Sequence, residues 1–185
     1  MKKIIPSFLT ILNLVCGCLA IALAFQFQFE AVLILVCLGV FFDFLDGLAA
    51  RALDSVTNFG KHLDSITDVI TSGVVPGIIV YQLFKLSGNK VSDFEVYAFG
   101  YDLIFSLSPI SFIGFLITIA SAIRLSKYNT LTRSDEFIGL PTPANAIFFA
   151  SLPVLINSEI LIESKELFLN NYFLIGSVIS SVILM

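Results

Sequence analysis

Residues 43–68 read DFLDGLAARALDSVTNFGKHLDSITD, a stretch that combines regularly spaced aspartates with small residues. On a helix, residues three or four apart lie on one face. Both halves of the stretch have this spacing: Asp43, Asp46, Gly47 and Ala50 in the first, and Gly60, Asp64 and Asp68 in the second. Two neighbouring helices joined by a short turn near residues 54–58 can therefore direct four carboxylates at one point.

The chain around this stretch is strongly apolar. Of its 185 residues, 57% are hydrophobic and only 13% are charged, and the mean hydropathy is +0.98. Soluble domains carry roughly 25% charged residues. The composition predicts an all-α polytopic membrane helix bundle forming a single domain over residues 1–185. With ten Lys and Arg and a net charge of −4, nucleic acid is not expected as a partner.

About six segments are long and apolar enough to cross a bilayer, which takes roughly 20 residues. We place them near residues 5–25, 31–50, 62–84, 101–123, 140–158 and 167–185. The four aspartates fall in the second and third segments. The chain ends within an apolar run that has no flanking charge or aromatic anchor, a pattern typical of a truncated copy of a longer protein.

The distribution of basic residues predicts the orientation, because Lys and Arg are enriched on the cytoplasmic side of membrane proteins. With a cytoplasmic amino terminus, seven basic residues lie on that side: Lys2, Lys3, Arg51, Lys61, Arg124, Lys127 and Arg133. Three lie opposite: Lys85, Lys90 and Lys165. We therefore expect a multi-pass protein of the cell membrane whose aspartates face the cytoplasm.

Four carboxylates within membrane helices need compensation, since one alone at a helix centre costs about 2.5–3.5 kcal/mol. Only Arg51, Lys61 and His62 are near in sequence. The excess of negative charge indicates bound cations, and oxygen ligands favour magnesium, manganese or calcium. Two such ions could serve four carboxylates and a diphosphate. A divalent-cation transporter is an alternative, but the acids gather toward one membrane face beside small residues suited to a nucleotide.

The spacing D-x2-D-G-x2-A-R-x8-G-x3-D-x3-D resembles the signature of the CDP-alcohol phosphatidyltransferases, and residues 43–68 fill every fixed position. These enzymes displace CMP from a CDP-linked lipid with an alcohol. The resemblance implies two Mg²⁺ or Mn²⁺ ions held by the four aspartates, with Asp68 also acting as the catalytic general base. It further implies that nucleotide and diphosphate lie beside Gly47, Ala50, Arg51 and Gly60.

The flanking sequence resembles the phosphatidylserine synthases within that family. Pro6, Thr10 and Asn13 match their first-helix pattern, although Ser7 replaces an asparagine, and residues 122–129 (AIRLSKYN) and 139–146 (GLPTPANA) resemble two further segments. The resemblance implies CDP-diacylglycerol as donor and L-serine as acceptor. Glycerol 3-phosphate and inositol phosphate are alternative acceptors, but they should demand more cationic groups.

Two residues are candidates for binding the acceptor. Arg124 could pair with the serine carboxylate, although the positive-inside bias explains it equally well. Asn13 could reach the substrate or hydrogen-bond across helices. The family commonly forms homodimers, and Gly73 and Gly77 around Pro76 fit either a close helix contact at such an interface or a kink at the proline.

Overall fold

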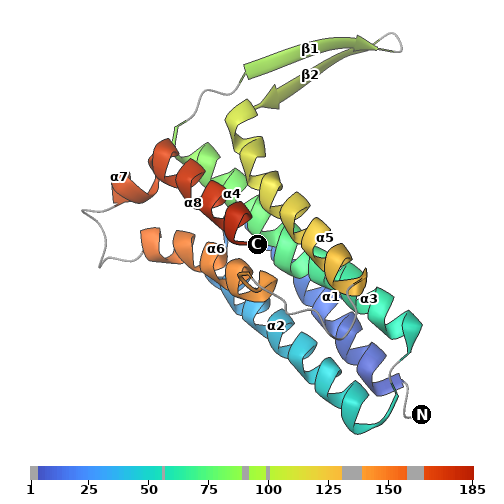
Figure 1. The fold of residues 1–185 in the computed structure, drawn as a ribbon. Helices are drawn as coiled ribbons and strands as arrows, with labels where there is room; N and C mark the ends of the chain where they lie inside the picture. Colours follow the sequence, from blue (N-terminus) through green and yellow to red (C-terminus); the bar gives the residue numbers. More distant parts are fainter. Residues whose placement is uncertain (1–3, 56, 89–91, 99–100, 131–138, 158–164) are drawn as a thin grey trace.

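The computed structural model describes residues 4–55, 57–88, 92–98, 101–130, 139–157 and 165–185. Within these ranges the chain is a bundle of helices with one projecting hairpin (Figure 1). The helices are α1 (Ile4–Phe25), α2 (Phe29–Ala52), α3 (Asn58–Val69), α4 (Val75–Leu86), α5 (Phe115–Thr130), α6 (Thr142–Asn157), α7 (Lys165–Phe168) and α8 (Asn171–Leu184). The predicted helical membrane fold is confirmed.

In the part of the chain that the structure describes, four helical stretches are long and apolar enough to cross a membrane: Ile5–Phe25, Phe29–Ala52, Asn58–Leu86 and Pro109–Lys127. The apolar helices Thr142–Asn157 and Asn171–Leu184 are shorter, at 16 and 14 residues. Both fall within segments that the sequence predicts as spans. All six predicted segments therefore contain helix, and four of those helices have the length of a full span.

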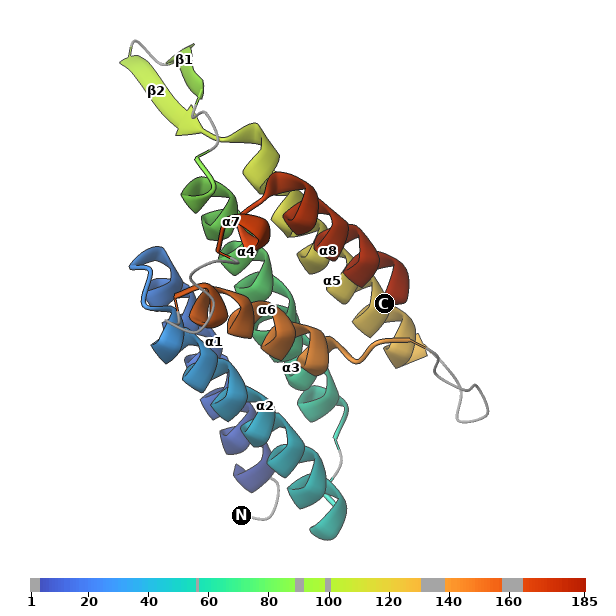
Figure 2. The ribbon, with the colours of Figure 1, turned by 90° about the vertical axis from the view of Figure 1, so that its left-hand side faces the viewer.

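The third span is the centre of the bundle. It runs without a break through α3, a π-helical turn at Ile70–Val74 and α4. In both views it lies between the α1–α2 pair and α5 (Figures 1 and 2). In its most apolar window 67% of the residues are buried, against 22–33% in the other three full-length spans. This burial lies mainly in the π-helical turn and α4, whereas α3, which carries Asp64 and Asp68, has Thr67 as its one fully buried residue.

The fourth span begins at Pro109, later than the predicted start at residue 101. Tyr101–Leu107 forms strand β2, which pairs antiparallel with β1 (Ser92–Ala98), and a 3₁₀ turn at Pro109–Gly114 leads into α5. Proline disfavours helical geometry in the residue before it, and Ser108 is accordingly extended, with φ −98° and ψ 104°. The prediction of helix over 101–108 was wrong. The hairpin projects from the end of the bundle opposite the α2–α3 turn (Figure 1).

Gly73 and Gly77 make a close helix contact within the chain. A Cβ at Gly73 would lie 3.1 Å from Cβ of Ser121, and one at Gly77 would lie 2.6 Å from Oγ1 of Thr118. The Thr118 hydroxyl also donates to the carbonyl oxygen of Gly73 at 3.0 Å. These two glycines therefore bring the third span and α5 together inside one protomer.

Replacing Gly77 by alanine should destabilise the fold by about 1–3 kcal/mol, because overpacking a tight contact forces the helices apart. Besides the threonine hydroxyl, the added Cβ would approach the Gly114 carbonyl oxygen to 3.2 Å. The measurement is the midpoint of thermal unfolding in detergent micelles.

The matched control is Gly176→Ala in α8, where an added Cβ would have no described atom within 4 Å. This variant should unfold at or slightly above the wild-type midpoint, since alanine favours helix over glycine. Equal midpoints for the Gly77 and Gly176 variants would contradict the close contact.

Candidate active site

Three aspartates from α2 and α3 converge at one place in the bundle. Asp43 comes from α2, and Asp64 and Asp68 come from α3. Each offers one carboxylate oxygen, and these three oxygens all lie within 4.8 Å of one another. The three side chains are half-buried. The short turn between the helices is set partly by Thr57, whose side chain caps α3 by accepting a hydrogen bond from the Gly60 amide at 3.0 Å.

Asp46, the fourth aspartate, faces α1. It is 6% exposed, and its Oδ2 accepts a hydrogen bond of 2.6 Å from Oγ1 of Thr10, which is 3% exposed. Thr10 has no role in the sequence-based prediction beyond matching a first-helix pattern. The usable signal was its position three residues before Asn13, which places both polar groups on one face of α1.

Asn13 lies beside Asp68. Its Nδ2 is 3.5 Å from Oδ1 of Asp68, a long hydrogen bond, and the side chain is 1% exposed. Its own Oδ1 has no hydrogen-bond partner among the described residues. Helix α1 is therefore a third wall of the acidic site, beside α2 and α3.

The small residues of the motif have different surroundings: Gly47 has space beside it, whereas Gly60 is packed tightly against the capping Thr57. A Cβ at Gly47 would have Nη2 of Arg51 as its nearest described neighbour, at 3.6 Å, and one at Gly60 would lie 3.1 Å from Oγ1 of Thr57. Ala50 is half-buried. Arg51 is exposed and donates from Nε to the Gly47 carbonyl oxygen at 3.0 Å, so its side chain folds back along α2.

Arg124 is buried in the helix packing, with 9% of its surface exposed. It shares a face of α5 with Ile117 and Ser121, both fully buried, and Ser121 packs against Gly73. Helix α5 packs against both α3 and the π-helical turn. Arg124, predicted to bind the acceptor, thus lies on α5, which packs on the side of the third span away from α1 and α2 (Figures 1 and 2).

The acidic cluster fits a hard divalent cation. Three carboxylate oxygens lie close together, and Oδ1 of Asp64 is buried with no hydrogen-bond partner in the described part of the chain. Lys61 and His62, the basic residues nearest in sequence to Asp64, are both exposed. Carboxylate oxygens are the ligands that magnesium, manganese and calcium prefer. The donor set and the unsatisfied buried oxygen therefore both suit a bound ion.

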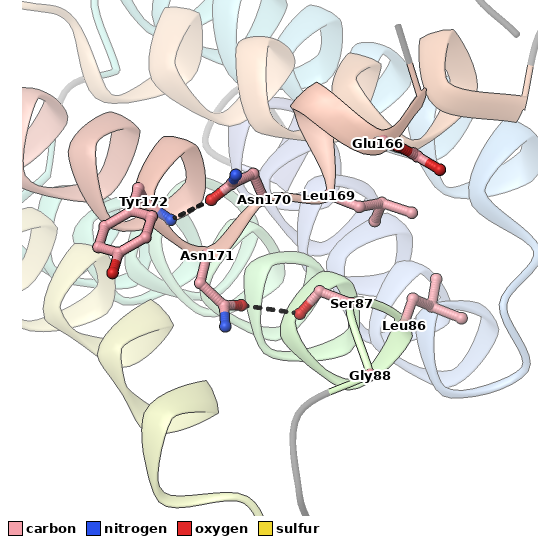
Figure 3. A pocket seen from close by; sticks show the side chains of 8 residues that line it. All are labelled: Leu86, Ser87, Gly88, Glu166, Leu169, Asn170, Asn171 and Tyr172. Carbon is pink, nitrogen blue, oxygen red and sulfur yellow. Dashed lines mark hydrogen bonds between the residues drawn. The ribbon is translucent and has the colours of Figure 1, made fainter. Parts of the chain in front are cut away.

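An open hollow of about 570 Å³ lies at the other end of the bundle, between the end of α4 and the start of α8 (Figure 3). Ser87 donates to Oδ1 of Asn171 there at 2.9 Å, and Asn170 caps α8 by accepting from the Tyr172 amide. Glu166 is the one carboxylate among the described residues that line it. Those lining residues contain no group of acids like the aspartate site, which lies far away along the third span.

A bundle of apolar helices with aspartates grouped from two consecutive helices suits a membrane protein that binds a divalent cation. Residues 3–183 match the model of the CDP-alcohol phosphatidyltransferase family. The match covers nearly the whole chain, so the chain belongs to this family, in agreement with the resemblance of its aspartate motif.

The chain is also similar to individual curated proteins. The chain is 32% identical over 144 residues to CDP-diacylglycerol–serine O-phosphatidyltransferase of Bacillus subtilis, covering 75% of this chain and 69% of that protein. It is 34% identical over 163 residues to the protein of the same name from Methanocaldococcus jannaschii, covering 87% and 67%. It is also 34% identical over 150 residues to archaetidylserine synthase of Methanothermobacter thermautotrophicus, covering 80% and 56%.

Proposed function

We propose that the chain transfers the phosphatidyl group from CDP-diacylglycerol to L-serine, giving phosphatidylserine and CMP. The observation that carries the proposal is the meeting of Asp43, Asp64 and Asp68 in a member of this family. The choice of serine is supported by the relatives, because all three described above are named for a serine-linked product or acceptor.

In this proposal the aspartates bind two divalent cations, Mg²⁺ or Mn²⁺. Asp43, Asp64 and Asp68 would hold them through the three adjacent oxygens, and Asp46 would complete the ligand set from the α1 side. Such ions neutralise a diphosphate and stabilise CMP as it leaves. The unsatisfied Oδ1 of Asp64 supports this assignment.

The transfer needs a base for the acceptor hydroxyl, and we assign that role to Asp68. The serine hydroxyl oxygen forms a bond to the phosphorus that carries diacylglycerol, while the anhydride bond to CMP breaks and CMP keeps the bridging oxygen. The hydroxyl proton passes to the Asp68 carboxylate. A carboxylate within hydrogen-bond reach of the hydroxyl can remove that proton as the new bond forms.

The substrates would surround the aspartates. The cytidine nucleotide would lie beside Gly47, Ala50 and Gly60, and Arg51 would swing from its own helix toward the diphosphate. Arg124 and Asn13 are the proposed contacts for serine. The lipid donor would enter sideways from the bilayer, and the aspartates would face the cytoplasm of the cell membrane. We also propose a homodimer, whose interface lies elsewhere than at Gly73 and Gly77, since both are used within the protomer.

Purified protein given CDP-diacylglycerol and Mn²⁺ or Mg²⁺ should release CMP with L-serine as the only added alcohol. Glycerol 3-phosphate and inositol phosphate should give at most background release. The measurement is CMP formation with each alcohol in turn.

Release only with a phosphorylated alcohol would contradict serine as acceptor and keep the family reaction. No release with any alcohol, together with Mn²⁺ flux into proteoliposomes, would favour the transporter. If the protein uses serine, the Arg124→Gln variant tests the role of Arg124. A raised KM for serine with an unchanged KM for the donor would place Arg124 at the serine carboxylate.

A further inference from the structure

We propose that Thr10 is a positioning residue for Asp46: its hydroxyl fixes the orientation of the Asp46 carboxylate, which in the proposed function is the fourth acid of the cation site. This inference rests on the proposed function, because it assumes that the aspartates bind divalent ions. It adds a residue from α1, outside the aspartate motif, to the machinery of the site.

The contact is buried and short. Thr10 and Asp46 are 36 positions apart and meet across the α1–α2 interface, with exposed fractions of 3% and 6%. The Oγ1–Oδ2 distance of 2.6 Å is in the range of charge-assisted O–H···O⁻ bonds, which are roughly twice as strong as neutral ones. Little water competes for either group at this depth in the packing.

The Thr10 hydroxyl has a second possible acceptor besides Asp46. Oγ1 of Thr10 lies 3.0 Å from the carbonyl oxygen of Pro6, the usual partner of a threonine one turn later in a helix. A hydroxyl has one proton and can donate one strong bond at a time. The carboxylate is closer and carries more charge, so the proton points toward Asp46.

Asp46 stands apart from the other three acids. The oxygens of Asp43, Asp64 and Asp68 form a group within 4.8 Å, to which Asp46 does not belong. With Oδ2 fixed by Thr10, the carboxylate cannot rotate freely, and its ordering cost falls on folding rather than on cation binding. Outer partners of this kind typically change metal affinity or activity 10–100-fold when removed.

The test compares Thr10→Val with Thr10→Ser. Valine keeps the shape of threonine without the hydroxyl, and serine keeps the hydroxyl. Mn²⁺ alone is titrated into each purified full-length protein in detergent, and free Mn²⁺ is followed by electron paramagnetic resonance. Thr10→Val should raise the Mn²⁺ dissociation constant about 10–100-fold, whereas Thr10→Ser should stay near the wild-type value.

The matched control is Thr71→Val. Thr71 is 2% exposed, and its hydroxyl donates to the Thr67 carbonyl oxygen within the third span at 2.8 Å. This variant also loses a buried helical hydroxyl, so it should lose similar thermal stability while binding Mn²⁺ like the wild type. Equal weakening by Thr71→Val and Thr10→Val would assign the effect to general loosening and overturn the proposal.

Other outcomes are also decisive. Wild-type Mn²⁺ affinity in Thr10→Val, or a Thr10→Ser variant as weak as the valine variant, overturns the positioning role and leaves the proposed reaction standing. A wild-type protein that binds no Mn²⁺ overturns both. In CMP release, the half-saturating Mn²⁺ concentration should rise in Thr10→Val, and the rate at saturating Mn²⁺ should change far less.

Discussion

Asp68→Asn should lower CMP release at saturating Mn²⁺ by about 10²–10⁴-fold, the usual contribution of a general base. Asparagine has nearly the same size, so the packing of α3 against α1 should survive, including the neighbouring Asn13 at 3.5 Å. The amide cannot take the proton of the serine hydroxyl. The measurement is the initial rate of CMP formation over a range of Mn²⁺ concentrations, which separates loss of the base from weaker ion binding.

Asp54→Asn is the matched control for this change. Asp54 is exposed, lies in the α2–α3 turn and has a φ of 48°. Asparagine adopts this left-handed conformation as readily as aspartate, so the turn should keep its shape. The control should turn over at the wild-type rate. Normal turnover by Asp68→Asn would contradict the assignment of Asp68 as the base.

Removing divalent ions should abolish CMP release and lower the thermal stability of the protein. Without a cation, three carboxylates with oxygens within 4.8 Å repel one another, and the buried Oδ1 of Asp64 is unsatisfied by any described group. At an ion concentration 100 times the dissociation constant, binding should stabilise the fold by about 2.7 kcal/mol. Unfolding midpoints in EDTA and in Mn²⁺ measure the difference.

The Asp64→Asn variant should respond to ion removal differently from the wild type. This change removes one charge from the cluster, so the ion-free protein should unfold at a higher temperature than the ion-free wild type. The variant should also lose most of the stabilisation by Mn²⁺. A wild-type protein with identical midpoints in EDTA and in Mn²⁺ would contradict cation binding at the aspartates.

The meeting of the acids could be predicted in part because some of its causes are local. The spacing from Asp43 to Asp46 and from Asp64 to Asp68 follows from helix geometry, and the short turn keeps the end of α2 close to the start of α3. Both helices pack mainly against α1, so the docking of α1 also sets how close the acids come. The apolar spans could also be predicted, because their composition alone requires them to form helices.

The features that the sequence did not predict are one strand and two contacts between helices. Tyr101–Leu107 is apolar enough for either a strand or a buried helix, and composition does not distinguish the two. The proline at 109 was the overlooked signal. The Thr10–Asp46 bond and the contact of Gly77 with Thr118 depend on how helices dock across long sequence separations, which one sequence does not encode visibly.

The position of the acids along their helices bears on how reactants arrive. Asp43 lies nine residues before the end of α2 at Ala52, and Asp68 lies ten residues after the start of α3 at Asn58. At 1.5 Å per residue, both are about 14–15 Å from the turn. In the proposed reaction, a centre this far from the turn would let a diacyl substrate and its product exchange by two-dimensional diffusion without extraction from the leaflet, while the water-soluble amino acid would have to enter the bundle to meet them.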